Sequence, residues 1–134
     1  MDGKAPNTLP KQERLYGKKN IENLLAGGRH GSVGPIRYIY TTDNGEQFSR
    51  ILTSVPKKLF KRAVKRNLLK RRIRESWRRL KHNLAESEHG MDILLIYSTK
   101  EILTYREIYD HIEKIINRLN ESRPKQVKNE TASE

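Results

Sequence analysis

The segment Lys57–Lys81 reads KKLFKRAVKRNLLKRRIRESWRRLK, and 13 of its 25 residues are Lys or Arg. Glu75 is its only acid, so the segment carries a charge of +12. The whole chain of 134 residues has 28 basic and 16 acidic residues, which also gives +12, so the rest of the chain is neutral. Charge concentrated in this way predicts a surface that binds a polyanion.

The apolar residues of this segment predict a helix rather than a disordered basic tail. Pro56 suits the start of a helix. At about 100° per residue one stripe is apolar, and it consists of Leu69, Ile73, Trp77, Leu80 and Leu84. The adjacent face is mostly cationic, and it consists of Asn67, Lys70, Arg71, Arg74, Arg78 and Lys81. We therefore expect a helix to about Leu84 that packs on a sheet and turns a ladder of cations outward.

Two simpler explanations of the charge fit this pattern less well. On a solvated helix face, like charges three and four residues apart are destabilising, and Glu75 alone offsets them. A helix on an anionic membrane would turn its apolar stripe toward lipid, whereas here the sheet needs that stripe. Nucleic acid is therefore the expected polyanion, although arginines at these spacings suit the phosphates of DNA and RNA alike.

Upstream of the basic segment the sequence predicts a β-hairpin. Residues 36–42 (IRYIYTT) are β-branched and aromatic, Asp43-Asn44-Gly45 is a hairpin turn signal, and a second strand is expected over about 47–55. Alternation places Tyr38 and Tyr40 on one face, where they would either stack on unpaired bases or pack in the sheet. The preceding segment 27–35 (GGRHGSVGP) lacks a phosphate-loop pattern and is expected to be a flexible connection.

The remaining elements complete an α+β domain. Apolar residues at i, i+3 and i+4 predict a short helix over 18–26. Residues 92–98 (DILLIYS) predict a strand covered on both faces, and Thr104 with Glu107 forms a capping box for a last helix. We expect a small mixed β-sheet packed by helices within residues 13–120, a flexible tail over 1–12 and a disordered tail over 121–134.

Catalytic and metal-binding patterns are missing from the sequence. The chain has no cysteine, and His30, His82, His89 and His111 share no ligand spacing. No serine lies in a nucleophile elbow. The N-terminus lacks the apolar region of a signal peptide, and no apolar run approaches the roughly 20 residues that cross a bilayer. We therefore expect a cytoplasmic binding protein without catalytic residues, protein-bound cofactor, metal site or membrane contact.

Residues 50–77, RILTSVPKKLFKRAVKRNLLKRRIRESW, closely resemble the signature of the bacterial ribonuclease P protein component. The matching positions are Arg50, Ser54-Val55, Lys57-Lys58, Ala63-Val64, Arg66-Asn67, Lys70-Arg71, Ile73-Arg74-Glu75 and Trp77. Segments 14–28 and 92–108 are similar to the family as well, so the resemblance covers about residues 14–119. The chain departs from the family pattern at Leu68, where a cation is expected, and at Ile21 and Leu25, where aromatic residues are common.

The resemblance implies a fold and a division of labour. The family fold is an αβββαβα sandwich with a left-handed βαβ crossover. The RNA subunit carries the active site with its Mg²⁺ ions and cleaves precursor tRNA at the mature 5′ end, while the protein binds that RNA and the 5′ leader. The implied RNA contacts are Lys57, Lys58, Lys61, Arg62, Lys65, Arg66, Asn67, Lys70, Arg71 and Arg74. The implied leader cleft, between the first helix and the sheet, is lined by Ile21, Leu25, Tyr38, Tyr40 and Arg50.

Two other classes of protein remain open on the sequence. A structural RNA-binding protein, such as a ribosomal protein, shares the charge pattern but has no role in cleavage. A DNA-binding regulator shares it too, yet no second short helix precedes the basic one at helix-turn-helix spacing. The partners that the resemblance implies are ribonuclease P RNA and precursor tRNA, and we expect no DNA partner.

Overall fold

The elements of the fold follow the order αβββαβα. The computed structural model describes residues 13–15, 17–85 and 89–122. Its elements are α1 (Lys18–Gly27), β1 (Arg29–Val33), β2 (Ile36–Thr41), β3 (Arg50–Ser54), α2 (Ala63–Leu80), the 3₁₀ turn η2 (Lys81–Asn83), β4 (Asp92–Tyr97) and α3 (Tyr105–Ser122). The strands form one four-stranded mixed sheet in the order β1-β2-β4-β3, which confirms the predicted α+β class.

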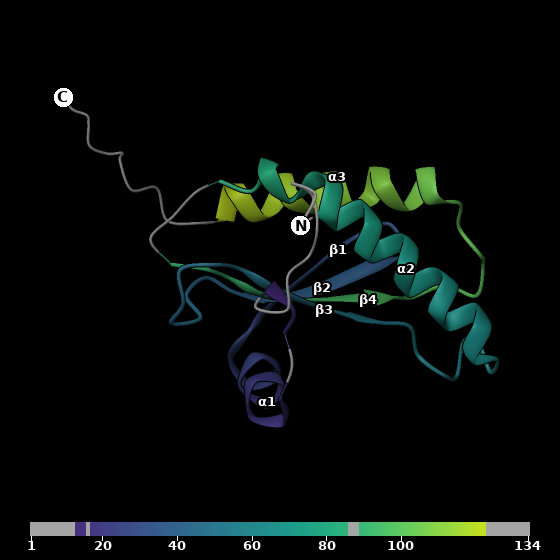
Figure 1. Cartoon of the computed structure of the whole chain (residues 1–134), viewed down its shortest axis with the longest axis horizontal. Helices are drawn as coiled ribbons and strands as arrows, with labels where there is room; N and C mark the ends of the chain where they lie inside the picture. Colours follow the sequence, from purple (N-terminus) through teal and green to yellow (C-terminus); the bar gives the residue numbers. More distant parts are fainter. Residues whose placement is uncertain (1–12, 16, 86–88, 123–134) are drawn as a thin grey trace, which may run out of the picture.

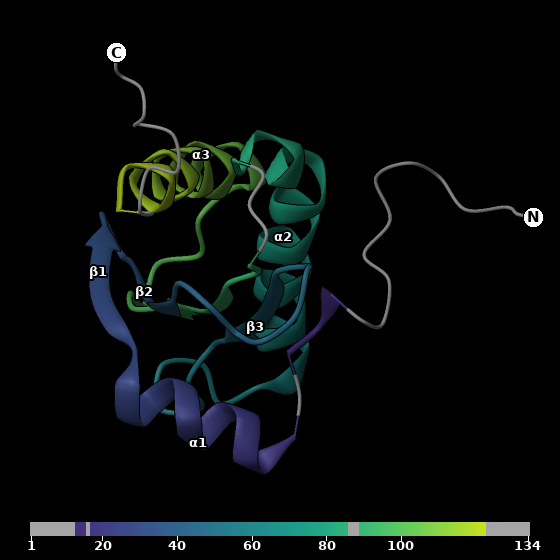
Figure 2. The same ribbon diagram turned by 90° about the vertical axis from the view of Figure 1, so that its left-hand side faces the viewer.

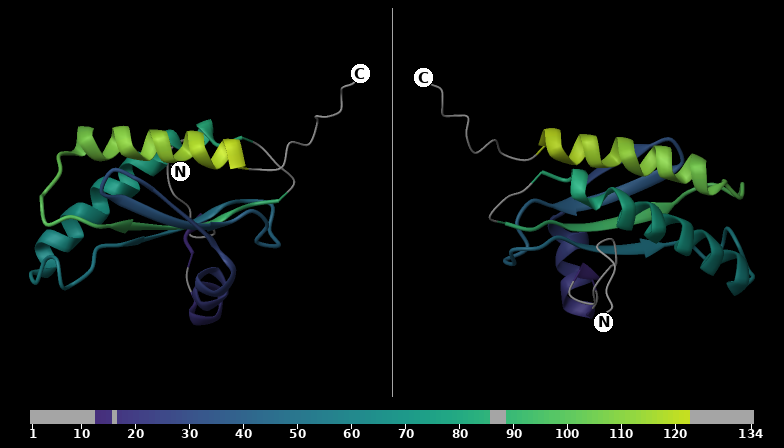
Figure 3. Two further views of the ribbon diagram at one scale, coloured as in Figure 1. Left: turned by 180° about the vertical axis from the view of Figure 1, so that it is seen from behind. Right: turned by 45° about the horizontal axis from the view of Figure 1, so that its top comes forward.

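The sheet separates two layers of helices (Figures 1 and 2). α2 and α3 lie side by side on one face, as Figure 3 also shows, and α1 lies on the other face. The larger core lies beneath α2 and α3. A smaller cluster lies between α1 and the sheet, and it consists of Leu15, Leu24, Ile39 and Leu94. Arg14 and Leu15 also pair with the outer edge of β3, where the Leu15 amide donates to the Ile51 carbonyl at 2.7 Å.

β4 occupies an inner position of the sheet, and this changes the predicted pairing. It pairs antiparallel with β2 (Ile39↔Leu94) and parallel with β3 (Leu52↔Leu94). β3, α2 and β4 therefore form a βαβ crossover. The predicted hairpin between β2 and β3 is wrong, because β4 lies between these strands and is buried along nearly its whole length.

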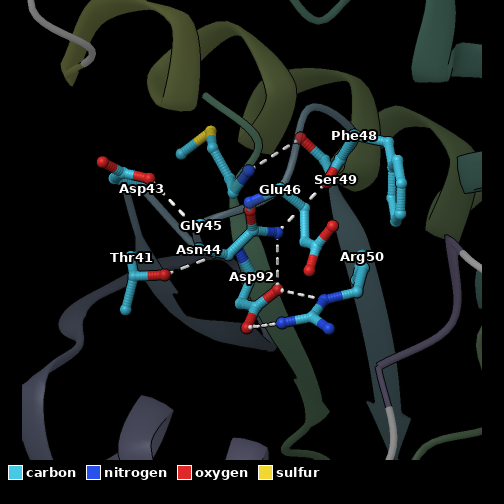
Figure 4. Close-up of polar contacts among 10 residues, drawn as sticks. Thr41, Asp43, Asn44, Gly45, Glu46, Phe48, Ser49, Arg50 and Asp92 are labelled. Carbon is cyan, nitrogen blue, oxygen red and sulfur yellow. Dashed lines mark hydrogen bonds and ion pairs between the residues drawn. The ribbon is translucent and has the colours of Figure 1, made fainter. Parts of the chain in front are cut away.

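The predicted turn at residues 43–45 does form, but it caps β4 instead of joining paired strands (Figure 4). Gly45 has a φ of 80°, and its amide donates to Asp43 Oδ1 at 2.9 Å. The loop then pairs with Gly90, which precedes β4: the backbone amide of Asn44 donates to the Gly90 carbonyl at 2.9 Å. A Cβ atom on Gly90 would lie 2.0 Å from the Phe48 carbonyl oxygen, so this close approach of two backbones requires glycine.

The glycine-rich segment 27–35 is not the flexible connection that the sequence predicted. Its residues Arg29–Val33 form β1, which pairs antiparallel with β2 across the turn Gly34-Pro35. Gly31 lies beside the ring of Tyr38, and a Cβ atom on it would lie 2.4 Å from Tyr38 Cζ. The sequence of β1 lacks the usual alternation of apolar and polar side chains, because the Tyr38 ring occupies the space where a side chain at position 31 would lie.

The outer helices begin and end at local signals. Gly28 caps α1 through its amide, which donates to the Leu24 carbonyl at 2.8 Å. Before α3, the Glu107 amide donates to Thr104 Oγ1 at 3.1 Å and the Thr104 amide donates to Glu107 Oε1 at 2.9 Å, which confirms the capping box. α3 extends to Ser122, past the predicted domain end at 120. The predicted N-terminal tail over 1–12 lies outside the described residues, and so does the predicted C-terminal tail over 121–134 apart from residues 121 and 122, which belong to α3. No helix in the described ranges is long and apolar enough to cross a membrane.

Candidate nucleic-acid interface

α2 has a buried side and a cationic side. Leu69 and Ile73 are fully buried, and Trp77 and Leu80 are 2% exposed, which confirms the predicted apolar stripe as far as Leu80. Leu84, the last residue of the predicted stripe, is half-buried and lies after η2, because α2 ends at Leu80 and not near Leu84. The side chains at positions 67, 71 and 74 are exposed on the other side of the helix. Because the buried stripe anchors α2 on the sheet, the cations on its outer side are held at fixed helical spacings.

Eight cations of the basic segment have no ion pair with any carboxylate in the described part of the chain. We call them the outer cation face. They are exposed except for position 70, which is half-buried, and they lie in the loop before α2 and on its N-terminal half: Lys57, Lys58, Lys61, Arg62, Lys65, Lys70, Arg71 and Arg74. Because no described carboxylate pairs with them, these side chains create a strong local positive potential. All eight were among the predicted RNA contacts.

Two arginines of the segment hold the backbone instead. Arg66, a predicted RNA contact, donates from Nη1 to the carbonyls of Phe60 at 2.7 Å and Lys61 at 2.9 Å, so it fixes the loop that leads into α2. Arg72 donates from Nη1 to the carbonyl of Leu103 and ties α2 to the connection between β4 and α3. Helical register places neither arginine on the predicted cationic face, and Arg66 was expected to contact RNA only because of the family resemblance.

The last cations of the segment are paired with acids. Arg78 binds Glu75 through Nε, 3.1 Å from Oε1, and through Nη2, and Arg79 Nε lies 3.2 Å from Glu75 Oε2. Lys81 Nζ lies 2.7 Å from Glu13 Oε1. The hydrogen bonds from Arg78 lower the pKa of Glu75 below its ordinary value, so this carboxylate stays ionised at neutral pH. The predicted cation ladder is therefore neutralised in part along the C-terminal turns of α2.

A buried tyrosine organises the connection that Arg72 contacts. Tyr97 OH accepts a hydrogen bond from the Leu103 amide at 2.9 Å and donates to the Glu101 carbonyl. Tyr97 is fully buried, and this burial raises the pKa of its phenol above the ordinary value. Leu103 is thus held by Tyr97 through its amide and by Arg72 of α2 through its carbonyl.

Tyr38 and Tyr40 are not on the face of the sheet where the leader cleft was predicted. They are 5% and 7% exposed in the larger core beneath α2 and α3, with ring centroids 5.8 Å apart. Alternation along β2 turns Arg37, Ile39 and Thr41 toward the opposite face, where Ile39 packs with α1 in the smaller cluster. The expectation that both tyrosines line a cleft beside α1 is therefore corrected: they pack in the core.

The predicted cleft residues Ile21 and Leu25 do lie on α1. Leu25 is 51% exposed, and Ile21 is half-buried against the smaller cluster. On the sheet beside them, the strand registers place exposed Arg37 next to Ile96 of β4 and Ile96 next to Ser54 of β3, both half-buried. This row ends at Ser54, the last residue of β3, after which the chain enters the loop that carries Lys57 and Lys58.

Arg50, the last predicted cleft residue, is held in an ion pair (Figure 4). Its Nε and Nη2 donate to Oδ1 and Oδ2 of Asp92, each at 2.8 Å, and Asp92 is 6% exposed. Asn44 Nδ2 donates to the same carboxylate at 2.9 Å. The network joins β3, β4 and the loop after β2, so the structure assigns Arg50 a role in holding the sheet together.

No group of three or more His, Asp or Glu side chains that could hold a metal ion occurs within residues 13–15, 17–85 and 89–122. His89 Nδ1 lies 3.5 Å from Asp43 Oδ1, and the His111 ring packs beside Gly34. The four histidines lie on separate segments of the chain.

Known proteins similar to this chain match most of its length and share its fold. Residues 9–120 match the family model described as Ribonuclease P. A protein of Porphyromonas gingivalis named ribonuclease P protein component is 33% identical over 125 residues, which cover 89% of this chain and 91% of that protein. A protein of the same name from Vibrio vulnificus is 30% identical over 111 residues, which cover 83% of this chain and 89% of that protein.

Solved structures agree with the fold. The RNase P protein of Staphylococcus aureus superposes with a TM-score of 0.68 at 23% identity, covering 79% of this chain and 94% of that one. The RNase P protein of Thermotoga maritima gives 0.68 at 24% identity, covering 79% and 96%. Together with the family match over most of the sequence, these comparisons identify the chain as a member of the ribonuclease P protein component family.

Proposed function

We propose that this chain is the protein subunit of a ribonuclease P ribonucleoprotein and that it binds the RNA subunit through the outer cation face. One observation carries the proposal: a loop and a half-helix present eight cations without a carboxylate partner in the described chain, on an element anchored by a buried stripe. Such a ladder suits the phosphates of a structured RNA, which it positions without reading sequence. The family membership supports RNA as the partner.

Two further side chains assist this face in different ways. Asn67 is exposed between the cations of α2 and supplies a neutral donor and acceptor. Arg66 keeps the loop before α2 in its conformation through the Phe60 and Lys61 carbonyls. In this proposal Arg66 acts on RNA binding mainly by positioning Lys61 and its neighbours in the loop.

We further propose that the 5′ leader of precursor tRNA lies along the α1 side of the sheet. The accessible groups there are the exposed side chains of Leu25 and Arg37 and the half-buried Ile96 and Ser54. No Tyr, Phe or Trp of the four described strands points to this face, so bases would rest on aliphatic side chains instead of stacking on aromatic rings. Contacts of this kind favour a leader of any sequence, held chiefly by its backbone.

Cleavage itself is assigned in this proposal to the RNA subunit, where Mg²⁺ supplies the charge stabilisation for phosphodiester hydrolysis. The contribution of this chain is binding: the outer cation face orients the RNA, and the sheet orients the leader. Its place of action is then the cytoplasm, where precursor tRNA is processed.

The test is cleavage of precursor tRNA by the source organism's ribonuclease P RNA at low Mg²⁺, with and without this protein. We expect the protein to restore 5′ maturation that the RNA performs poorly alone. If the protein binds this RNA tightly and cleavage does not change, the subunit assignment falls and a structural RNA-binding protein becomes the better description.

A further inference from the structure

Glu75 is the only acid of the basic segment, and it has an unusual set of contacts. Its two carboxylate oxygens accept hydrogen bonds from Arg78 Nε at 3.1 Å, from Arg78 Nη2, and from Arg79 Nε at 3.2 Å. One carboxylate thus engages two guanidinium groups, one at i+3 and one at i+4 of the same helix. The pairing lies directly after Arg74, the last cation of the outer cation face.

A role in stability explains this arrangement poorly. The Glu75 side chain is 36% exposed, and the Arg79 side chain is 56% exposed. Ion pairs between neighbouring turns at an exposed helix surface contribute little to folding, because water and salt screen them. Neutralising this carboxylate therefore leaves the buried stripe of α2 in place.

The effect on an approaching polyanion is larger. A phosphate that binds Arg78 or Arg79 must either displace the Glu75 carboxylate or bind the remaining N–H groups beside its negative charge, and the repulsion between the two anions weakens binding in both cases. The hydrogen bonds from Arg78 also keep Glu75 ionised, so protonation does not remove the obstacle at neutral pH. Phosphates therefore bind more favourably on the N-terminal side of Glu75 than on its C-terminal side.

The next cation along the chain shows the same pattern from an independent contact. Lys81 Nζ lies 2.7 Å from Glu13 Oε1, so the acid here comes from the segment before α1, 68 residues away. Beyond Arg74, the described cations of the segment are thus all paired with a carboxylate. Two acids from distant parts of the sequence mark the same boundary.

We infer that Glu75 is a specificity-determining residue that ends the RNA-binding surface after Arg74 by withholding Arg78 and Arg79 from phosphates. The inference rests on the proposed RNA-binding function and adds a limit to it. With the surface confined to the loop and the N-terminal half of α2, an RNA gains full affinity only when its phosphates match that short ladder. Additional accessible cations would raise the affinity for every RNA, so the selectivity for ribonuclease P RNA over other RNA would fall.

The test compares the salt dependence of RNA binding in wild type and Glu75→Gln, with poly(U) and the source organism's ribonuclease P RNA as probes. Glutamine keeps the shape and removes the charge. Two freed guanidinium groups should steepen the slope of log K against log salt by about 0.7 to 0.9 for each new phosphate contact. Affinity for poly(U) should rise more than affinity for ribonuclease P RNA. Glu113→Gln on exposed α3 changes net charge equally and should leave the slope unchanged.

A second pair of measurements makes the result decisive. Arg78→Gln with Arg79→Gln should leave the slope unchanged in the wild-type background and should remove the steepening in the Glu75→Gln background. An unchanged slope in Glu75→Gln, or a reduced slope when both arginines are replaced in wild type, overturns the inference. If Glu75→Gln does not fold, the comparison of wild type with Arg78→Gln, Arg79→Gln still tests the inference. Failure of the cleavage assay would remove the subunit assignment alone, because poly(U) reports the boundary without it.

Discussion

The guanidinium of Arg50 and the carboxylate of Asp92 form a two-point ion pair, 2.8 Å at each contact, between the parallel neighbours β3 and β4. Asp92 is 6% exposed, so removing its partner leaves a nearly buried charge uncompensated. Arg50→Ala should lower the free energy of unfolding by about 2–4 kcal/mol. Urea denaturation measures this, and a loss no larger than that of Arg106→Ala on the surface of α3 would refute the structural role of Arg50.

The contact of Gly90 with the Phe48 backbone provides a second test of the fold. A Cβ atom at Gly90 would lie 2.0 Å from the Phe48 oxygen, so Gly90→Ala forces the loop away from β4. We expect a destabilisation of about 1–3 kcal/mol. Gly27→Ala is the matched control, because nothing lies within 4 Å of its Cβ position. This control should be neutral or stabilising by up to about 1 kcal/mol. Equal thermal shifts for the two variants would contradict the packing of this loop.

Tyr97 links stability to high pH. Tyr97→Phe leaves the buried Leu103 amide without its acceptor and should cost about 1–3 kcal/mol, whereas Tyr109→Phe should cost little. Burial raises the pKa of Tyr97 above the ordinary value of 10.0. The neutral phenol therefore stabilises the fold below that pH, and the contribution is lost as pH rises through the folded-state pKa.

The unfolding free energy of the wild type should thus fall more steeply above about pH 10 than that of Tyr97→Phe. Parallel pH profiles for the two proteins, measured by urea denaturation between neutral and alkaline pH, would show that the phenol titrates alike in the folded and unfolded chains.

Arg37 tests the proposed leader path. It is exposed on the α1 side of the sheet, beside Ile96. Arg37→Ala should reduce the affinity of the ribonucleoprotein for precursor tRNA with a leader and should leave the affinity for mature tRNA unchanged. The salt slope of the leader-dependent part should fall by about 0.7, the value for one contact to a single strand. Arg106→Ala serves as the surface control, and an equal loss for tRNA with and without a leader would remove Arg37 from the path.

Local periodicity and turn chemistry were sufficient to predict several elements of this fold. The stripe Leu69, Ile73 and Trp77 and the capping box of Thr104 and Glu107 depend on residues within a few turns of one another, and both are confirmed. The α+β class follows from the order of the elements, whereas the βαβ crossover was implied by the family resemblance. The resemblance at residues 50–77 supplied the family, which the comparisons confirm.

The sequence did not predict which strands pair or which face of the sheet each side chain takes, because both depend on residues far apart in the chain. The turn at residues 43–45 has hairpin chemistry, yet β4 enters between β2 and β3 and takes up their pairing. Both faces of the sheet carry a helix, so alternation alone did not decide which helix Tyr38 faces. Likewise, helical register left Arg72 off the cationic face of α2 but could not name its partner, because the acceptor is the carbonyl of Leu103, 31 residues away.

The most direct test of the account is the salt dependence of binding to the source organism's ribonuclease P RNA for wild type and for Arg71→Ala with Arg74→Ala. Both side chains are exposed on α2, away from the buried stripe, so folding should be preserved. We predict weaker binding and a slope reduced by about 0.7 to 0.9 for each of the two lost contacts. Arg106→Ala on α3 should bind as the wild type does. An unchanged slope in the double variant would contradict the claim that the outer cation face of α2 binds this RNA.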